Sequence, residues 1–390
     1  MAIYKLFPYK DTTLYSYYPE MNTGIDPIIE ISNTNFVDSD IVNPRIARYL
    51  MEFVQTEIVD VIDNKIAGSE WDVNLKSFIA TAHGVVKSTD LSVNPVAQYW
   101  WNGTGIYLDT PQTTDGAQWY SPNFSGSLAW SSSGTDNTDN YITSSFNATY
   151  VDQGGGSWYH SASNGTLYAV TQSFDTRSDK DLNVEVKTIV EKWYSGSLGL
   201  NVTASLPNYG FIVKWLNSTE FATDIQTQPI MQFYSVDTNT IYPPQLEFKW
   251  KDFSNVLTGS LTSSIVDTTN LVSSLAENPG EFFPSSINRF RFNLAPKYPV
   301  RTFQTASQFT GTNFLPTASY YAVKDLDTNE FVIDYDTTYT QISSDGSGNY
   351  FDIYMNGLEP ERYYKILIKT NIGGSTLILD DNYYFKVING

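Results

Sequence analysis

The sequence predicts an all-β protein that contains two β-sandwiches. Aromatic residues are abundant, with 28 Tyr, 22 Phe and 9 Trp among 390 residues, and such side chains favour pleated strands. Short apolar-aromatic runs with period two recur, as in EKWYSG, NYGFIVKW and FYSVDTNTIYPPQLEFKW. Gly, Pro, Asn and Ser/Thr separate these runs. Together the pattern is typical of closely spaced antiparallel strands.

Length, charge and the absence of Cys exclude several classes of protein for this chain. A chain of 390 residues is too long for one ordinary domain. Acidic residues outnumber basic ones by 42 to 23, which gives a net charge of −19. Nucleic acid is therefore not an expected partner, because phosphate binding needs a concentrated positive surface. The sequence has no Cys, so neither disulfides nor thiolate metal sites can form.

The first residues predict no export signal. MAIYKLFPYKDTTLYSYYPE mixes aromatic with polar residues and lacks both a continuous apolar segment and a small-residue cleavage site. No stretch approaches the roughly 20 apolar residues that span a bilayer. We therefore expect neither export nor a membrane partner.

The N-terminal part begins with two predicted strands, at residues 4–7 and 28–32, and a turn-rich connection lies between them. The segments VNLKSFIATAHGVV and LSVNPVAQYWW predict two further strands. A long segment rich in Gly, Ser, Thr and Asp follows at about residues 101–159, with isolated Trp residues in it. Loops of this length in compact domains are more often functional than idle.

Several motifs recur through residues 10–251: an opening with Asp11, Thr13, Tyr15, Pro19, Asn22 and Gly24, a loop with Trp101, Gly103, Gly105, Pro111, Gly116 and Trp119, and the runs DLNVEVKTIVEKWYSG, NYGFIVKW, FYS and YPPQLEFKW. Together these motifs resemble the DNRLRE family of β-sandwich modules. The resemblance covers about residues 10–251. It implies a jelly-roll-like sandwich with long loops and one or two short helices, of the kind found on microbial surfaces and in tailed-phage virions.

The resemblance also implies local structure. It makes residues 48–54 a strand, and residues 55–66 then have the apolar spacing of a short helix. A single helix over residues 49–66 also fits that spacing and is the alternative. In DLNVEVKTIVEKWYSG the resemblance implies a strand that runs into a second short helix.

Three segments are expected along the chain: a first sandwich at residues 1–252, a connection at residues 253–286, and a smaller sandwich at residues 287–390. The last segment alternates strand patterns with Asp-Gly-Ser-Gly and Gly-Gly turns, as immunoglobulin-like sandwiches do. Its run LEPERYYKILIKT also resembles the strand entry of fibronectin-like domains.

Motifs for catalysis are missing from the sequence, and we expect neither an enzyme nor a cofactor. The two histidines, His83 and His160, are not accompanied by a nucleophile-elbow motif. The oxygen-rich runs at residues 136–140 and 325–329 lack the twelve-residue frame of an EF-hand. They predict ordinary Asx turns rather than calcium loops.

The leading hypothesis is a non-enzymatic structural protein of a tailed-phage virion, a capsid-decorating, collar or tail-associated subunit. The missing export signal favours assembly in the host cytoplasm. Partners would be capsid, neck or tail proteins, with many copies or a homo-oligomer in each particle. A third class, a polysaccharide-degrading enzyme, stays open because carboxylate separations depend on the fold.

The alternative function is a carbohydrate-binding adhesin or tail-fibre module that attaches to host-surface glycans. The stacking residues would be Trp100, Trp101, Trp119, Trp130 and Trp158. Indole rings suit such contacts because they combine apolar faces with a polar edge. The same rings could instead hold the long loops in place.

A basic cluster predicts a docking surface. It consists of Arg289, Arg291, Lys297 and Arg301, which alternate with Phe290, Phe292, Tyr298 and Phe303 as the two faces of a strand would. Arginine next to aromatic residues suits a protein interface. The expected partner is an acidic surface of a neighbouring virion protein or of a second copy. Pairing with nearby Asp and Glu of the same chain is the alternative.

Overall fold

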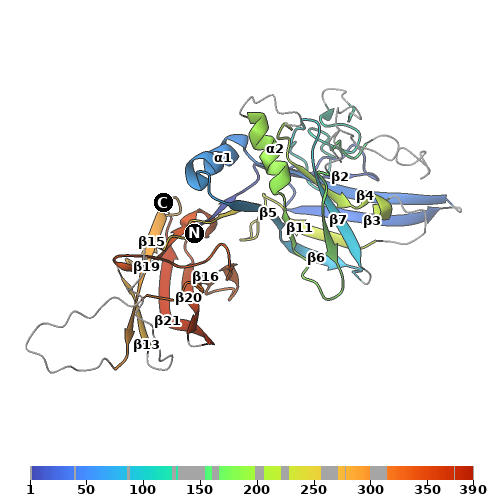
Figure 1. Ribbon diagram of the computed structural model, residues 1–390. Helices are drawn as coiled ribbons and strands as arrows, with labels where there is room; N and C mark the ends of the chain where they lie inside the picture. Colours follow the sequence, from blue (N-terminus) through green and yellow to red (C-terminus); the bar gives the residue numbers. More distant parts are fainter. Residues whose placement is uncertain are drawn as a thin grey trace, which may run out of the picture. The chain divides into compact units, whose positions relative to one another are not determined.

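The chain forms two compact units that are discontinuous in sequence. The computed structural model describes residues 2–38, 41–85, 88–124, 129–130, 154–159, 167–197, 206–220, 228–255, 271–276, 278–298, 314–372 and 374–389. The larger unit comprises Leu6–Lys65 and Val73–Glu247, and the smaller unit comprises Met1–Lys5, Ile66–Asp72 and Phe248–Gly390. Both chain ends therefore belong to the smaller unit (Figure 1). The expected domains are continuous, and their boundaries stay a prediction.

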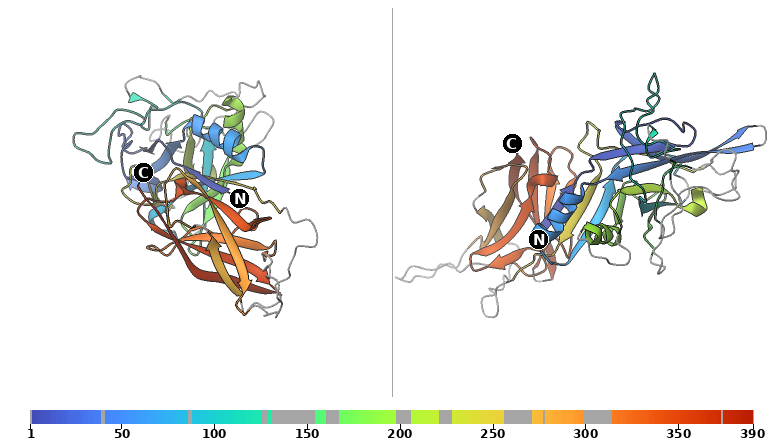
Figure 2. Two further views of the ribbon diagram at one scale, coloured as in Figure 1. Left: turned by 90° about the vertical axis from the view of Figure 1, so that its left-hand side faces the viewer. Right: turned by 90° about the horizontal axis from the view of Figure 1, so that it is seen from above.

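An eight-stranded antiparallel sheet dominates the larger unit. Its order is β6 (Ile79–His83), β11 (Ile230–Tyr234), β3 (Ile28–Asp38), β4 (Ile41–Glu52), β10 (Phe211–Trp215), β7 (Thr89–Pro95) and β8 (Val170–Phe174), and β2 (Lys10–Tyr15) also pairs with β4. Strands β3 and β4 run side by side as a long pair (Figures 1 and 2). A four-stranded sheet has the order β1 (Ala2–Leu6), β12 (Gln245–Trp250), β5 (Trp71–Ser77) and β9 (Leu182–Glu185).

Period-two alternation along β4 divides its side chains between two environments. Tyr49 is fully buried, and its hydroxyl lies 3.3 Å from that of Ser77 on β5. Leu50, on the opposite face, belongs to a core cluster with four Trp residues of the long loops. We call residues 97–124, 129–130 and 154–159 the loop layer. The eight-stranded sheet is therefore covered by β5 on one face and by the loop layer on the other.

Two short helical segments confirm the expected strand-to-helix transitions. Strand β4 ends at Glu52, and α1 (Gln55–Asp60) continues directly into a π-helical turn (Val61–Ile66). The alternative of one helix over residues 49–66 is therefore wrong. Strand β9 is followed by α2 (Lys187–Ser197). The run EKWYSG lies in this helix and is not a strand.

Strand β2 was not expected, because the sequence predicts only a connection there. Its residues KDTTLY are all buried although four of them are polar. The ammonium group of Lys10 binds the Glu52 carboxylate at 2.8 Å and the carbonyl oxygen of Trp100 at 2.7 Å. Alternating apolar residues are the usual sign of a strand, and β2 lacks them. Its polar side chains can be buried because they have partners, which lie far away in the sequence. The segment VNLKSFIATAHGVV, which was expected to form one strand, contributes to two strands, β5 and β6.

Two sheets face each other in the smaller unit. One has the order β13 (Leu271–Ala276), β15 (Ile287–Pro296), β19 (Gly348–Tyr354) and β18 (Ser343–Asp345). The other has β14 (Glu281–Phe282), β21 (Ser375–Val387), β20 (Tyr363–Ile372), β16 (Ser319–Asp325) and β17 (Phe331–Ile333). Tyr321 and Phe351 stack between them with ring centroids 4.4 Å apart. The predicted all-β sandwich class is confirmed. No helix in the described ranges is long and apolar enough to cross a membrane.

A buried carboxyl group on β2 makes the stability of the larger unit depend on pH. Asp11 is fully buried, and its Oδ2 accepts a hydrogen bond of 2.7 Å from the backbone N–H of Val236. Its Oδ1 has no hydrogen-bond partner among the described residues. Burial raises the pKa of Asp11 to about 8, and the nearby carboxylates of Asp237 and Asp26 add to this effect.

We expect Asp11→Asn to stabilise the protein near neutral pH. Between the ordinary pKa of 3.8 and about 8, folded Asp11 holds a proton that the unfolded chain releases. The wild-type free energy of unfolding should therefore fall as pH rises through this window, and the variant lacks that contribution. Urea unfolding at several pH values checks this: the advantage of the variant should grow from pH 4 to about pH 8. Parallel pH profiles for the two proteins would contradict it.

Candidate functional site

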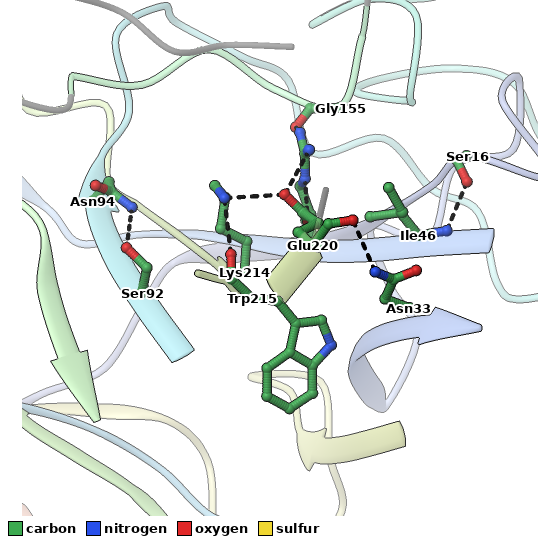
Figure 3. A network of polar contacts seen from close by, with 10 residues as sticks. Ser16, Asn33, Ile46, Ser92, Asn94, Gly155, Lys214, Trp215 and Glu220 are labelled. Atoms are coloured by element: carbon green, nitrogen blue, oxygen red, sulfur yellow. Dashed lines mark hydrogen bonds and ion pairs between the residues drawn. The ribbon is translucent and has the colours of Figure 1, made fainter. Parts of the chain in front are cut away.

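A fully buried charge network lies between the eight-stranded sheet and the loop layer. Arg48 on β4 makes a two-pronged contact with Glu220, with both N–O distances 2.9 Å. Glu220 ends the short helix α3 (Asn217–Glu220) directly after β10, and Lys214 on β10 binds its Oε2 at 3.0 Å. The three side chains are at most 1% exposed. Figure 3 shows Lys214 pointing toward Glu220, whose backbone oxygen accepts a bond of 2.9 Å from Asn33.

The network holds two cations and one anion. Burial alone would raise the pKa of Glu220, but attraction by Arg48 and Lys214 outweighs burial and holds this pKa below its ordinary value. Aromatic faces compensate the extra positive charge. The Arg48 guanidinium lies 5.0 Å from the Trp119 ring and 5.1 Å from the Trp158 ring, and the Lys214 ammonium also lies 5.1 Å from Trp158.

Arg48 also joins the loop layer to the sheet. Its Nη1 donates a hydrogen bond of 2.7 Å to the carbonyl oxygen of Gly155. Gly155 has a φ of +79°, and an added Cβ would lie 2.6 Å from Arg48 Nη1 and 2.6 Å from the Trp119 ring. Only glycine fits this position. Because the network is closed and inaccessible to solvent, it positions the loop layer and offers no reacting group to a substrate.

A second fixed point lies at the start of the loop layer, and we call it the Asn22 junction. The Asn22 amide donates hydrogen bonds of 2.8 Å to the carbonyl oxygens of Asn102 and Ala117. Its Oδ1 accepts bonds from the N–H groups of Gly24 and Gly105 at 3.0 and 2.9 Å. Every hydrogen-bonding position of this amide is used. An added Cβ at Gly105 would lie 2.2 Å from the Asn22 backbone oxygen.

Four of the five predicted stacking residues are core residues. Trp100, Trp119, Trp130 and Trp158 are 0%, 1%, 6% and 1% exposed. The indole N–H groups of Trp100 and Trp130 each donate a bond of 2.9 Å, to the backbone oxygens of Tyr209 and Gln118. Their burial leaves no ring face for a glycan, so these side chains hold the loops.

The fifth, Trp101, is 40% exposed and lies beside Tyr99, which in turn lies beside Tyr209. Tyr99 and Tyr9 are 43% and 49% exposed, and Tyr209 is half-buried. We call Tyr9, Tyr99, Trp101 and Tyr209 the aromatic platform. The sequence indicated Tyr99 only through its position in the YWW triplet, and it gave no signal that Tyr9 and Tyr209 would join this surface.

The predicted docking arginines pair within the smaller unit. Arg289 contacts Asp352 through two bonds of 2.9 and 2.8 Å, and Arg291 contacts Asp345 through two bonds of 2.9 Å. The Arg291 guanidinium holds the pKa of Asp345 below its ordinary value. Lys297 is exposed, and Arg301 lies outside the described residues. The geometry therefore matches the intramolecular alternative for both described arginines.

Other candidate positions do not form a reactive site. His83 is exposed at the end of β6, and His160 and residues 136–140 lie outside the described residues. Asp325 accepts backbone N–H bonds from Asp327 and Thr328 at 2.7 and 3.1 Å, which is the expected Asx turn. In the described ranges no three His, Asp or Glu side chains are grouped to hold a metal ion.

Comparison with protein-family models, with curated proteins and with solved structures finds no match. The resemblance to the DNRLRE family therefore stays a prediction.

Changes to the buried network should differ in effect according to the charge that they leave behind. Glu220→Gln leaves Arg48 and Lys214 buried without an anion and turns an amide N–H₂ toward N–H donors. We expect a loss of about 3–5 kcal/mol in the free energy of unfolding. Lys214→Met, the matched control, leaves the balanced Arg48–Glu220 pair and should cost clearly less. Urea unfolding followed by Trp fluorescence measures both, and equal losses would contradict the charge argument.

The Asn22 junction should not tolerate a methyl group. Gly105→Ala forces a Cβ against the Asn22 backbone oxygen, so we expect a destabilisation of about 1–3 kcal/mol and faster proteolysis within residues 101–124. Gly346→Ala is the control, because no atom lies within 4 Å of the added Cβ there. Limited proteolysis with mapped cleavage sites gives the answer. Cleavage of both variants at the wild-type rate would show that the junction does not fix the loop.

Proposed function

We propose that the chain is a non-enzymatic structural subunit of a tailed-phage virion. The observation that carries the proposal is that residues of the DNRLRE resemblance make structural contacts in the larger unit. Asn22, Gly24 and Gly105 bind one another in the Asn22 junction. Trp119 lies buried against the guanidinium of Arg48. These residues serve the architecture of a sandwich module, as expected of a scaffold.

The rigid loop layer further supports a scaffold role. Long loops normally lose order when few contacts hold them. Here the Asn22 junction and the Arg48 bond to Gly155 hold two separate parts of the loop layer. A subunit present in many copies benefits from a surface that keeps one conformation, because assembly then costs little ordering entropy.

The negative net charge is expected to keep free subunits apart before assembly. The net charge of −19 makes free subunits repel one another. Such repulsion delays non-specific association until a complementary neighbour is present. The proposed partners are therefore capsid, neck or tail subunits that offer basic or uncharged surfaces.

Quantitative mass spectrometry of gradient-purified phage particles from cells that produce the chain tests this role. We expect the chain to co-sediment with DNA-containing particles at several copies per particle, in a fixed ratio to the major capsid protein. A cytoplasmic host enzyme of similar abundance serves as the control for carry-over. Recovery of the chain only in particle-free fractions, or at the level of the host enzyme, would refute the proposal.

A further inference from the structure

The aromatic platform consists of three exposed rings and the half-buried Tyr209 ring, and the buried Lys10 ammonium lies against two of them, Tyr99 and Tyr9. The Tyr99 ring lies 4.7 Å from the Trp101 ring at an interplanar angle of 85° and 6.0 Å from the Tyr209 ring. The Lys10 ammonium lies 4.4 Å from the Tyr99 centroid and 5.3 Å from the Tyr9 centroid. Contiguous exposed apolar surface marks interaction sites more often than singly exposed side chains do.

Buried polar contacts fix the Tyr9 part of the platform. Lys10 and Glu52 form an ion pair at 2.8 Å, with side chains only 5% and 8% exposed. Tyr9 donates a hydroxyl bond of 2.6 Å to Glu52, and its backbone N–H donates a bond of 3.0 Å to the Glu52 carbonyl oxygen. Tyr9 is therefore fixed before any ligand arrives. Binding would cost little of the side-chain entropy that flexible surfaces lose.

The backbone of Trp101 is fixed on both sides although its ring is exposed. Its N–H donates to the Pro122 carbonyl oxygen at 3.0 Å, and its own carbonyl oxygen accepts from Ala117 at 2.7 Å. The preceding residue, Trp100, is fully buried and receives the Lys10 ammonium on its carbonyl oxygen. The chain thus presents the Trp101 ring outward from a rigid support, which is the geometry that ligand-contacting residues require.

The chemistry of the platform fits a saccharide. Aromatic faces match the C–H groups on the faces of a sugar ring, and tyrosine hydroxyls and the indole N–H match the hydroxyls around its edge. Lys10 and Glu52 neutralise each other, so the platform has no spare cation for an anionic sugar. The net charge of −19 also opposes the approach of an anionic polymer.

We propose that the aromatic platform is a binding site for a neutral saccharide, with Trp101 and Tyr99 as the stacking residues and Tyr9 beside them. The site does not depend on the proposed virion role. A virion subunit that carries it would hold neutral host-surface glycan weakly at each copy and strongly through many copies.

The test uses the full chain on a printed array of neutral hexose and N-acetylhexosamine oligomers beside uronate- and sialate-bearing glycans. Titration calorimetry with cellohexaose and chitohexaose follows. We expect binding to neutral glycans and at least a tenfold loss of affinity in Trp101→Ala and in Tyr99→Ala. Tyr120→Ala is the matched control, because Tyr120 is 45% exposed in the same loop layer and lies outside the platform. Its affinity should equal that of the wild type.

Near-ultraviolet circular dichroism establishes that each variant is folded, and Tyr99→Ala decides the question should Trp101→Ala fail to fold. No binding to any neutral glycan would overturn the proposal. So would unchanged affinity in the folded platform variants, an equal loss in Tyr120→Ala, or a preference for the acidic glycans. Because particle incorporation is measured separately, a failure here leaves the virion proposal intact, and the reverse also holds.

Discussion

The buried interaction of Arg48, Glu220 and Lys214 is the constraint on which the larger unit depends. Burying a carboxylate between two cations on one face of a sheet costs desolvation energy, which hydrogen bonds and neighbouring groups must offset. The loop layer supplies such groups, because Gly155 accepts a hydrogen bond from Arg48 and Trp158 lies against both cations. The loops are therefore a required layer of the fold and not a variable decoration of it.

A fixed loop layer changes what its surface residues can do. Binding residues are often found on loops that a rigid scaffold positions. Here two adjacent residues have different roles. Trp100 packs in the core, whereas Trp101 is 40% exposed and available for contact at the surface. The same polar contacts that bury Lys10 beneath Tyr9 and Tyr99 keep those rings in place. Scaffold and surface thus share one set of interactions.

Local sequence patterns predicted strand segments within β3 and β10, whereas the DNRLRE resemblance implied the end of β4 and the helix α2 after β9. The structure contains all of these elements. Strand β2 was missed because its polar side chains become buried only through distant partners, such as Glu52 for Lys10. Nor does the sequence distinguish the buried Trp100 from the exposed Trp101. The backbone of Trp101 is bonded to Pro122 and Ala117, and these pairings depend on the folded loop layer. Long-range pairing has no local signature.

Charge places a limit on how such a chain assembles. Arg289 and Arg291 are already matched by Asp352 and Asp345 in two-pronged pairs. An acidic neighbour would have to displace these carboxylates, and exchanging one partly exposed pair for another gains little free energy. Two copies of a chain with net charge −19 also repel each other. Stable contacts between copies therefore need uncharged, aromatic surfaces, whereas contacts through carboxylates need a partner that brings its own basic groups.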